Sequence, residues 1–375
     1  MQQRKVLAAL GACRTAAMGG HLQRCTACDT QTPVYNSCGN RHCPKCQAGD
    51  RAAWLTARSR ELLPVEYFHV VFTVPHELAP VAAAHPAVFY NLLFRAVRET
   101  LLQVAATPRH LGAQIGGLMV LHTWGQTLEL HPHVHVIVPG GGLSPDGTRW
   151  ISCQPGFFLP VRVLSRLLRG KLLAFLREVY DRRELRWTGG LAPLADPAQF
   201  ARLLAPLYQK EWAVYAKPPH NGPGQALKYL ARYTYRVAIS NERIELLEND
   251  QVTFRYKDYA HGHRWRRMTL TVHEFLRRFM QHVLPRGFVR IRSFGLLANR
   301  GRDKQLARCR QLLECMERET VAETSEVLRN SSADEDSRRC PACGQGTLLL
   351  VARTPRPRQS ELVASTYRLR IFDSS

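Results

Sequence analysis

Two closely spaced pairs of cysteines lie near the N-terminus of this chain. Cys25 and Cys28 form one Cys-x-x-Cys turn, and Cys43 and Cys46 form another. A turn of this length lets two thiolates bind one tetrahedral ion, so two turns together supply the four ligands of a structural zinc site. We therefore expect these four cysteines to hold one Zn²⁺ ion. The alternative is an accidental pairing within a cysteine-rich segment.

Further donors surround this expected zinc site. His21, Cys38 and His42 could replace one of its ligands or help to bind a second ion, whereas Cys13 is expected to pack as a small apolar residue. Because residues 1–50 contain few apolar side chains, zinc would supply most of their folding free energy, on the order of 10 kcal/mol. The segment is therefore predicted to be a zinc-ribbon-like module.

Histidines alternate with valines in the middle of the chain. Side chains of a β-strand alternate between its two faces, so His133 and His135 are expected on one face and Val134, Val136 and Val138 on the other. Two imidazoles on one face can converge on a single divalent ion. The alternative is a pair of surface histidines on an edge strand.

A tyrosine pair with helical spacing follows. Tyr229 and Tyr233 are four residues apart, so in a helix their phenols would lie one above the other on a single face, flanked by the cationic Lys228 and Arg232. Such a pair is often part of a hydrophobic core. Two phenols directed at one polar site are the functional alternative.

Cationic and aromatic residues are interleaved further along the chain, as is typical of surfaces that bind single-stranded DNA. Each such segment could equally be the solvated face of a strand. They are Phe254–Tyr259, His263–Arg267 with Arg264, Arg266 and Arg267, and Arg286–Arg292.

A last cysteine pair, Cys340 and Cys343, lies near the C-terminus. With Cys309 and Cys315 it could close a second zinc site, although the spacing of that second pair is unusual for zinc ligands.

The composition agrees with a nucleic-acid partner. The 375 residues carry 52 Lys+Arg against 30 Asp+Glu, a net charge of +22, and 45% are hydrophobic. This excess indicates a polyanionic partner, although arginine-rich codon usage would produce it as well. Because no apolar run is long enough for a membrane span and no export signal is recognisable, we expect a cytoplasmic protein with reduced thiols and no membrane partner.

The elements expected around these residues indicate an α+β fold. Strands are expected at residues 67–74, 117–130, 133–138, 212–216 and 236–240, a hairpin at 252–256 and 265–270, and helices at 50–63, 82–105, 163–180, 224–235 and 272–283. An acidic stretch near residue 320 suggests a linker. We expect a zinc module at 1–50, a catalytic domain at 51–313, the acidic linker at 314–339 and a C-terminal tail at 340–375.

These motifs, in this order, resemble the two-tyrosine HUH transposases of the insertion-sequence-ninety-one family. The resemblance covers most of residues 11–300. It is carried by Tyr35–Cys46, Tyr67–Leu78, the strand His131–Val138, the tyrosine helix Gln225–Tyr235, Tyr215–Pro219, Arg236–Asn241, Leu284–Phe288 and Ala298–Asn299.

The resemblance implies a fold and a metal site. HUH nucleases have an antiparallel sheet flanked by helices, similar to ferredoxin or RRM domains. They bind Mg²⁺ or Mn²⁺ through the histidine pair, here His133 and His135, and one further polar residue. We expect that residue to be Gln126 on the preceding strand, with His131 and His122 as alternatives.

It also implies a reaction. Tyr229 and Tyr233 would cleave single-stranded DNA of transposon ends and target, leaving 5′-phosphotyrosine and a free 3′-OH, as in rolling-circle transposition in the bacterial cytoplasm at the nucleoid. Tyr235 points elsewhere on the helix. Two alternatives are a plasmid relaxase or replication initiator with the same chemistry, and a non-catalytic zinc-dependent DNA-binding protein. The second tyrosine and the N-terminal cysteines favour a transposase, whereas the oligomeric state is not indicated.

Overall fold

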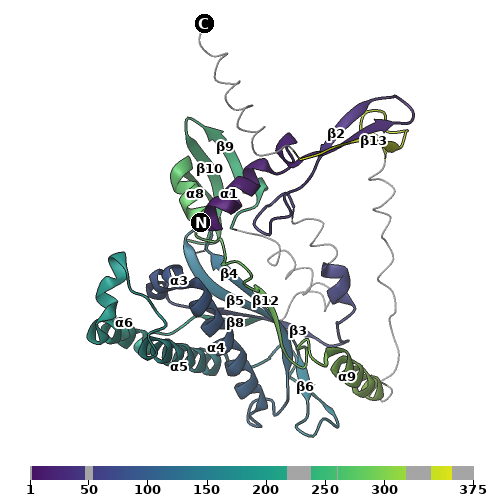
Figure 1. Ribbon diagram of the computed structural model, residues 1–375. Helices are drawn as coiled ribbons and strands as arrows, with labels where there is room; N and C mark the ends of the chain where they lie inside the picture. The colour runs from purple at the N-terminus through teal and green to yellow at the C-terminus, as the bar shows by residue number, and fades with distance from the viewer. Residues whose placement is uncertain (1, 47–53, 218–237, 260, 318–338, 357–375) are drawn as a thin grey trace. The chain divides into compact units, whose positions relative to one another are not determined.

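The computed structural model describes residues 2–46, 54–217, 238–259, 261–317 and 339–356 (Figure 1). The chain divides into two compact units. Met1–Ala48 and Ala322–Ser375 form the first, and Gly49–Val321 forms the second. The C-terminal segment, expected to be a separate tail, therefore folds together with the N-terminal segment.

The first unit contains a small antiparallel sheet with the strand order β13-β1-β2. Helix α1 (Gln2–Ala12) precedes β1 (Gly20–Cys25), and β2 (Gln31–Tyr35) returns beside it. On the other edge of β1 lies β13 (Leu348–Thr354), with Cys25 opposite Leu348 and Gly20 opposite Thr354. Strands from the two ends of the chain are therefore hydrogen-bonded neighbours.

The second unit is built on a five-stranded antiparallel sheet with the order β12-β4-β5-β3-β8. Its strands are β3 (Tyr67–Thr73), β4 (Gly116–Trp124), β5 (Leu130–Pro139), β8 (Val214–Lys217) and β12 (Ile291–Gly295). The strands expected at 67–74 and 133–138 are confirmed, and the expected strand at 117–130 ends earlier because residues 125–129 turn back into β5.

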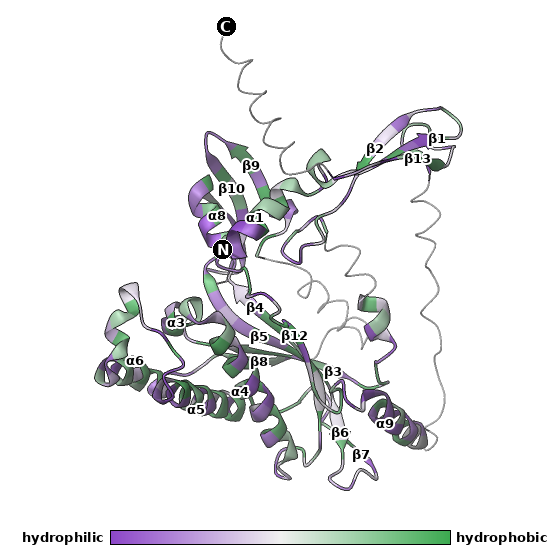
Figure 2. Ribbon diagram, in the orientation of Figure 1, coloured by the Kyte–Doolittle hydropathy of each residue, from purple (hydrophilic) through white to green (hydrophobic). Residues whose placement is uncertain are grey.

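Helices cover one face of this sheet (Figure 1). They are α3 (Ala79–Ala84), α4 (Pro86–Ala106) and α5 (Val161–Asp181), and α6 (Pro197–Gln209) packs against α5. Figure 2 shows hydrophobic and hydrophilic residues along the same helices α4 and α5, as expected when one side of a helix packs into a core. Val134, Val136 and Val138 of β5 are fully buried in that core, which confirms the expected alternation.

A three-stranded sheet follows, with the order β11-β10-β9. Its strands β9 (Ile244–Glu248), β10 (Gln251–Asp258) and β11 (Arg264–Thr271) lead into helix α8 (Val272–Met280). The expected hairpin is therefore confirmed. Phe254 of β10 contacts Phe275 of α8, which fixes the helix against one face of this sheet. The strand expected at 236–240 is not formed by its described residues 238–240.

Shorter elements complete the second unit. Residues 54–59 are helical, β6 (Gly141–Leu143) pairs with β7 (Trp150–Ser152), and α9 (Arg302–Glu317) buries Leu306, Cys309 and Leu313 in a separate apolar cluster. The short 3-10 helices η2 (His76–Leu78), η3 (Gly189–Ala195) and η4 (Asn241–Arg243) connect larger elements of this unit, whereas η1 (Ala16–Met18) lies in the first unit between α1 and β1. Of the helices described, none is both long and apolar enough to cross a membrane.

Candidate functional site

Three histidines converge on the sheet face that lies away from α4 and α5. His133 and His135 alternate with the buried valines of β5, and the strand register places His122 of β4 directly opposite His133. One ring nitrogen of each of these three residues lies within 4.8 Å of the others. The donor set and its convergence fit a single divalent ion, so His122 joins the expected pair.

Gln126, expected as the third ligand, is not on the preceding strand. It lies in the turn between β4 and β5, where its Oε1 accepts a hydrogen bond from the backbone N–H of Lys257 at 3.3 Å. Its carbonyl oxygen accepts one from Nη2 of the buried Arg243 at 2.6 Å. Gln126 thus joins the β4–β5 turn to the three-stranded sheet β11-β10-β9, which is called the second sheet below. The register of the β4–β5 hairpin is the signal that points to His122.

A fourth histidine, His69 of β3, was missed by the sequence reasoning. Its Nε2 lies 2.7 Å from Nδ1 of His135, and the two rings stack with centroids 5.0 Å apart. The signal was present, because alternation along residues 67–73 puts His69 on the face opposite to Phe68 and Val70. His69 therefore orients the His135 ring at the edge of the site.

Burial favours the neutral form of these imidazoles. Removal from water lowers the pKa of His133 to about 4 and that of His69 to about 4, and it holds the pKa of His135 well below its usual value. Nδ1 of His133 lies 2.7 Å from the carbonyl oxygen of His131, which can only accept, so Nδ1 carries the proton and Nε2 keeps its lone pair. Neutral imidazole with an oriented lone pair is the metal-binding form.

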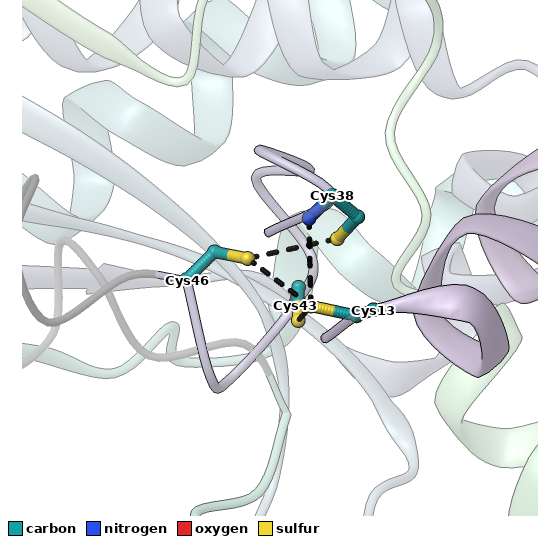
Figure 3. Close-up of side chains that lie close together, drawn as sticks. All are labelled: Cys13, Cys38, Cys43 and Cys46. Atoms are coloured by element: carbon teal, nitrogen blue, oxygen red, sulfur yellow. Dashed lines mark hydrogen bonds between the residues drawn. The ribbon is translucent and has the colours of Figure 1, made fainter. Parts of the chain in front are cut away.

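Four cysteine sulfurs converge in the first unit (Figure 3). Cys13 follows α1, and Cys38, Cys43 and Cys46 lie in the loop after β2. The Sγ atom of Cys13 is 3.5 Å from those of Cys43 and Cys46, and Cys38 Sγ is 3.6 Å from Cys46 Sγ. Zn–S bonds of 2.3 Å in a tetrahedron place sulfurs about 3.8 Å apart, so these separations fit one zinc ion.

The expected grouping of the zinc ligands is therefore wrong. Cys25 and Cys28 do not join Cys43 and Cys46 but lie with Cys340 and Cys343 in a second cluster. Cys13, expected to be an apolar packing residue, is a member of the first cluster. Cys309 is buried among leucines of the second unit and does not accompany Cys340, while Cys315 has no described side chain.

His42 and His21 do not enter either cluster. The side-chain oxygen of Asn40 lies 3.0 Å from Nδ1 of His42 and also accepts its backbone N–H, and His21 Nε2 lies 3.1 Å from the side-chain nitrogen of Gln23. The segment expected to form the tyrosine helix, with Tyr229, Tyr233, Lys228 and Arg232, falls outside the described residues.

The three expected DNA-binding arginines of β11 are exposed and lie on two faces of the second sheet. Arg267 is opposite Arg255 and shares its face with Trp265, whereas Arg264 and Arg266 lie on the other face. Arg266 pairs with Asp258 at 3.0 Å and Arg267 with Glu245 at 2.7 Å. The guanidinium of Arg255 lies 5.4 Å from the centre of the Trp265 ring, so one open face combines cations with an exposed indole.

Among solved structures, the chain is similar to the conjugative relaxase TrwC. In complex with mutant oriT DNA that protein shares 19% identity, with 46% of this chain and 68% of the other covered and a TM-score of 0.26. A metal-free structure of TrwC with oriT DNA gives 17% identity over the same shares, with a TM-score of 0.26. TM-scores this low do not by themselves establish a shared fold.

Two curated proteins resemble the chain over most of its length. The "Putative transposase y4qJ" of Sinorhizobium fredii (strain NBRC 101917 / NGR234) is 51% identical over 354 residues, which are 93% of this chain and 89% of that protein. The "Transposase for insertion sequence element IS801" of Pseudomonas savastanoi pv. phaseolicola is 27% identical over 345 residues, which are 89% and 80% of the two chains.

Two family models match as well. The model described as "Putative transposase" matches residues 116–305, and the model described as "Transposase zinc-binding domain" matches residues 1–74. The first covers half of the chain and contains His122, His133 and His135, and the second contains the first cysteine cluster together with Cys25 and Cys28. The chain therefore belongs to the IS91 family of transposases.

Proposed function

We propose that this protein is a transposase that cleaves and rejoins single-stranded DNA at the ends of its element. The observation that carries the proposal is the convergence of His122, His133 and His135 on one face of the central sheet, in a member of a transposase family. A purely DNA-binding protein has no need for three imidazoles that converge on one point, two of them buried. Membership of the family favours a transposase over a plasmid relaxase with the same chemistry.

The three imidazoles would hold a divalent ion. When bound, such an ion polarises the scissile phosphate and stabilises negative charge on the leaving 3′ oxygen. Nitrogen donors suit Mn²⁺ better than Mg²⁺, which prefers oxygen ligands. We therefore expect Mn²⁺ to support cleavage at lower concentration than Mg²⁺. His69 and the carbonyl of His131 act by orienting the rings of His135 and His133.

Tyr229 and Tyr233 supply the nucleophiles in this proposal. The phenol gives up its proton as its oxygen forms a bond to phosphorus, the bond from phosphorus to the 3′ oxygen breaks, and the 3′ oxygen takes up a proton to leave a free 3′-OH. The phosphodiester energy is kept in the 5′-phosphotyrosine, so rejoining needs no ATP. A second tyrosine lets the protein hold two strands at once. Their helical spacing and the family assignment support these roles.

The open face of the second sheet is the proposed contact for the DNA strand. Trp265 is 59% exposed and can stack on a base, while Arg255, Lys257 and Arg267 lie beside it on the same face. Arg264 and Arg266 add positive charge on the opposite face. Because Arg266 and Arg267 already pair with carboxylates, we expect the aromatic ring to contribute more than either of these two cations.

The four sulfurs of Cys13, Cys38, Cys43 and Cys46 are proposed to hold a structural zinc ion. Their mutual separations fit a tetrahedral site, and they lie within the segment that matches the zinc-binding domain. In this closed site all four positions are taken by protein ligands, so the ion has no place for a substrate.

Covalent capture tests the proposed function. Full-length protein would be incubated with single-stranded oligonucleotides covering the ends of its own element and Mn²⁺, and adducts mapped by mass spectrometry. We expect a 5′-phosphotyrosine on Tyr229 or Tyr233, loss of all adduct in the Tyr229→Phe, Tyr233→Phe double variant, and retained adduct in the control Tyr235→Phe. An adduct that persists in the double variant, or that maps to Tyr235, would contradict the assignment.

A further inference from the structure

A second group of four cysteines lies in the first unit and joins residues from opposite ends of the chain. Cys25 ends β1 and Cys28 lies in the β1–β2 turn, while Cys340 and Cys343 lie in the turn that precedes β13. The zinc-binding family model ends at residue 74, so it contains only the first two of these ligands. That pair has no other cysteine partners in the matched segment, because the remaining four form the first cluster.

The distances between sulfurs fit a tetrahedral ion. Cys25 Sγ lies 3.7 Å from Cys343 Sγ, and Cys28 Sγ lies 3.8 Å from Cys340 Sγ, with all four within 4.8 Å of one another. A zinc tetrathiolate requires about 3.8 Å. A disulfide requires about 2.05 Å, which is far shorter. All four are free cysteines.

The backbone around the sulfurs is arranged to support thiolates. The N–H of Ala27 donates to Cys25 Sγ at 3.3 Å, and the N–H of Gly346 donates to Cys343 Sγ at 3.5 Å. Such bonds stabilise negative charge on sulfur. A Cβ atom at Gly346 would collide with Cys25 Sγ, so a glycine is needed where the C-terminal turn packs against the N-terminal one.

The two turns are also joined by their backbones. The N–H of Thr26 donates to the carbonyl of Thr347 at 3.0 Å, and the N–H of Thr347 donates to the Thr26 hydroxyl at 3.0 Å. The two turns are therefore in contact directly beyond the last residue pair of β1 and β13, Cys25 and Leu348. Little apolar burial accompanies this junction, since Leu349, Leu350 and Val351 of β13 are about half exposed.

We propose that Cys25, Cys28, Cys340 and Cys343 bind a second structural Zn²⁺ ion, which fastens the C-terminal strand β13 to the N-terminal zinc module. Each end of the chain supplies half of the ligands, so neither half alone completes the site. The C-terminal segment is then a required part of the zinc-binding fold, and loss of residues beyond 339 would remove one zinc ion and one edge of the β13-β1-β2 sheet.

Metal counting tests this inference. Zinc per chain would be measured by elemental analysis on full-length protein carrying His133→Ala and His135→Ala, so that the imidazoles add nothing. We expect two zinc ions in this background and one after Cys340→Ser with Cys343→Ser. The control Cys153→Ser changes a half-buried cysteine outside both clusters and keeps two. Two ions retained without Cys340 and Cys343, or one ion to begin with, would overturn the proposal.

Pairs of substitutions test the grouping. Cys28→Ser combined with Cys343→Ser removes two ligands of one site and should cost one zinc ion, whereas Cys13→Ser combined with Cys343→Ser removes a ligand from each site and should cost both. Equal losses in the two pairs would contradict the assignment of ligands.

Thiol alkylation tests the same proposal without any substitution, so it can be used if the variants fail to fold. Bound metal should slow alkylation of Cys28 and Cys343 by on the order of 10-fold or more relative to chelator-treated protein. Alkylation of Cys153 should change little. Equal rates for Cys343 with and without chelator would show that no metal protects it.

Discussion

The histidine site and the cysteine-built unit are organised in opposite ways. The histidines lie on a sheet whose other face is packed against α4 and α5 through a large core of buried aliphatic and aromatic side chains. In the described part of the first unit, Val6 and His42 are buried, and the other buried residues are cysteines and glycines: Cys13, Gly19, Gly20, Cys25, Cys43, Cys340 and Gly346.

The difference indicates what metal does in each region. A sheet with a packed core positions its imidazoles before any ion binds, so binding free energy remains available for chemistry. A unit with almost no apolar core cannot offset the conformational entropy of folding without its ions. We infer that metal serves catalysis in the sheet and folding in the cysteine-built unit.

Metal removal should give the largest difference between the two regions, because it should unfold the cysteine-built unit and leave the histidine sheet folded. Treatment with a strong chelator removes the zinc contribution, on the order of 10 kcal/mol per structural site, and should unfold β1, β2 and β13. Hydrogen exchange would show these strands losing protection while β4 and β5 keep theirs. Protection retained in β1 and β2 of metal-free protein would mean that the unit folds without its ions.

The packing that supports the histidine sheet can be weakened without touching a ligand. Arg243 is 8% exposed, and it donates to the carbonyl oxygens of Gln126 at 2.6 Å and Arg255 at 2.8 Å. Arg243→Met leaves both acceptors unpaired by this residue and should lower the free energy of unfolding by about 2–4 kcal/mol. Denaturant unfolding would measure this.

A surface arginine provides the matched control. Arg277, on α8, is paired with Glu274 and its side chain is 54% exposed, so Arg277→Met should cost less than about 1 kcal/mol. Equal losses of unfolding free energy in the two variants would show that the hydrogen bonds of Arg243 do not stabilise the β4–β5 turn.

The third ligand is tested by comparing His122 with Gln126. His122→Ala removes an imidazole from the converging set and should weaken Mn²⁺ binding by roughly 10–100-fold, with nicking partly restored at high Mn²⁺. Gln126→Ala should leave the Mn²⁺ requirement nearly unchanged, because its side-chain oxygen accepts from Lys257. Titration of nicking against Mn²⁺ would measure both, and the reverse order of effects would restore Gln126 as the ligand.

The smallest effects are expected on the second sheet. Trp265→Ala should weaken binding of single-stranded DNA by about 1–3 kcal/mol through lost stacking, and Arg267→Ala should lower the salt slope of binding by about one or less. Fluorescence anisotropy over a range of salt would measure both. Unchanged affinity in Trp265→Ala would mean that this face is only a solvated surface.

The sequence predicts local features well and distant pairings poorly. Alternation along β5 predicted which face carries His133 and His135, because a strand's period of two is independent of its neighbours. The choice between His122 and Gln126 depended on where β4 ends. Residues 125–129 form the turn to β5, so Gln126 lies in the turn and His122 is the residue paired with His133.

The cysteines show the same limit more clearly. Proximity in sequence suggested that Cys25 and Cys28 pair with Cys43 and Cys46, but the pairing of β1 with β13 brings Cys340 and Cys343 to them from the other end of the chain. No local pattern encodes that contact. The case of His69 is related: alternation along β3 indicates its face, but its closeness to His135 depends on the pairing of β3 with β5.

Nicking by His133→Ala protein is the most direct test of a catalytic role for the histidine site. The measurement would compare Mn²⁺-dependent cleavage of a single-stranded element end with hydrogen exchange of β4 and β5 in the same preparation. We predict that cleavage falls at least about 100-fold while DNA binding and the protection of both strands stay nearly unchanged. Undiminished cleavage in this variant would contradict the account.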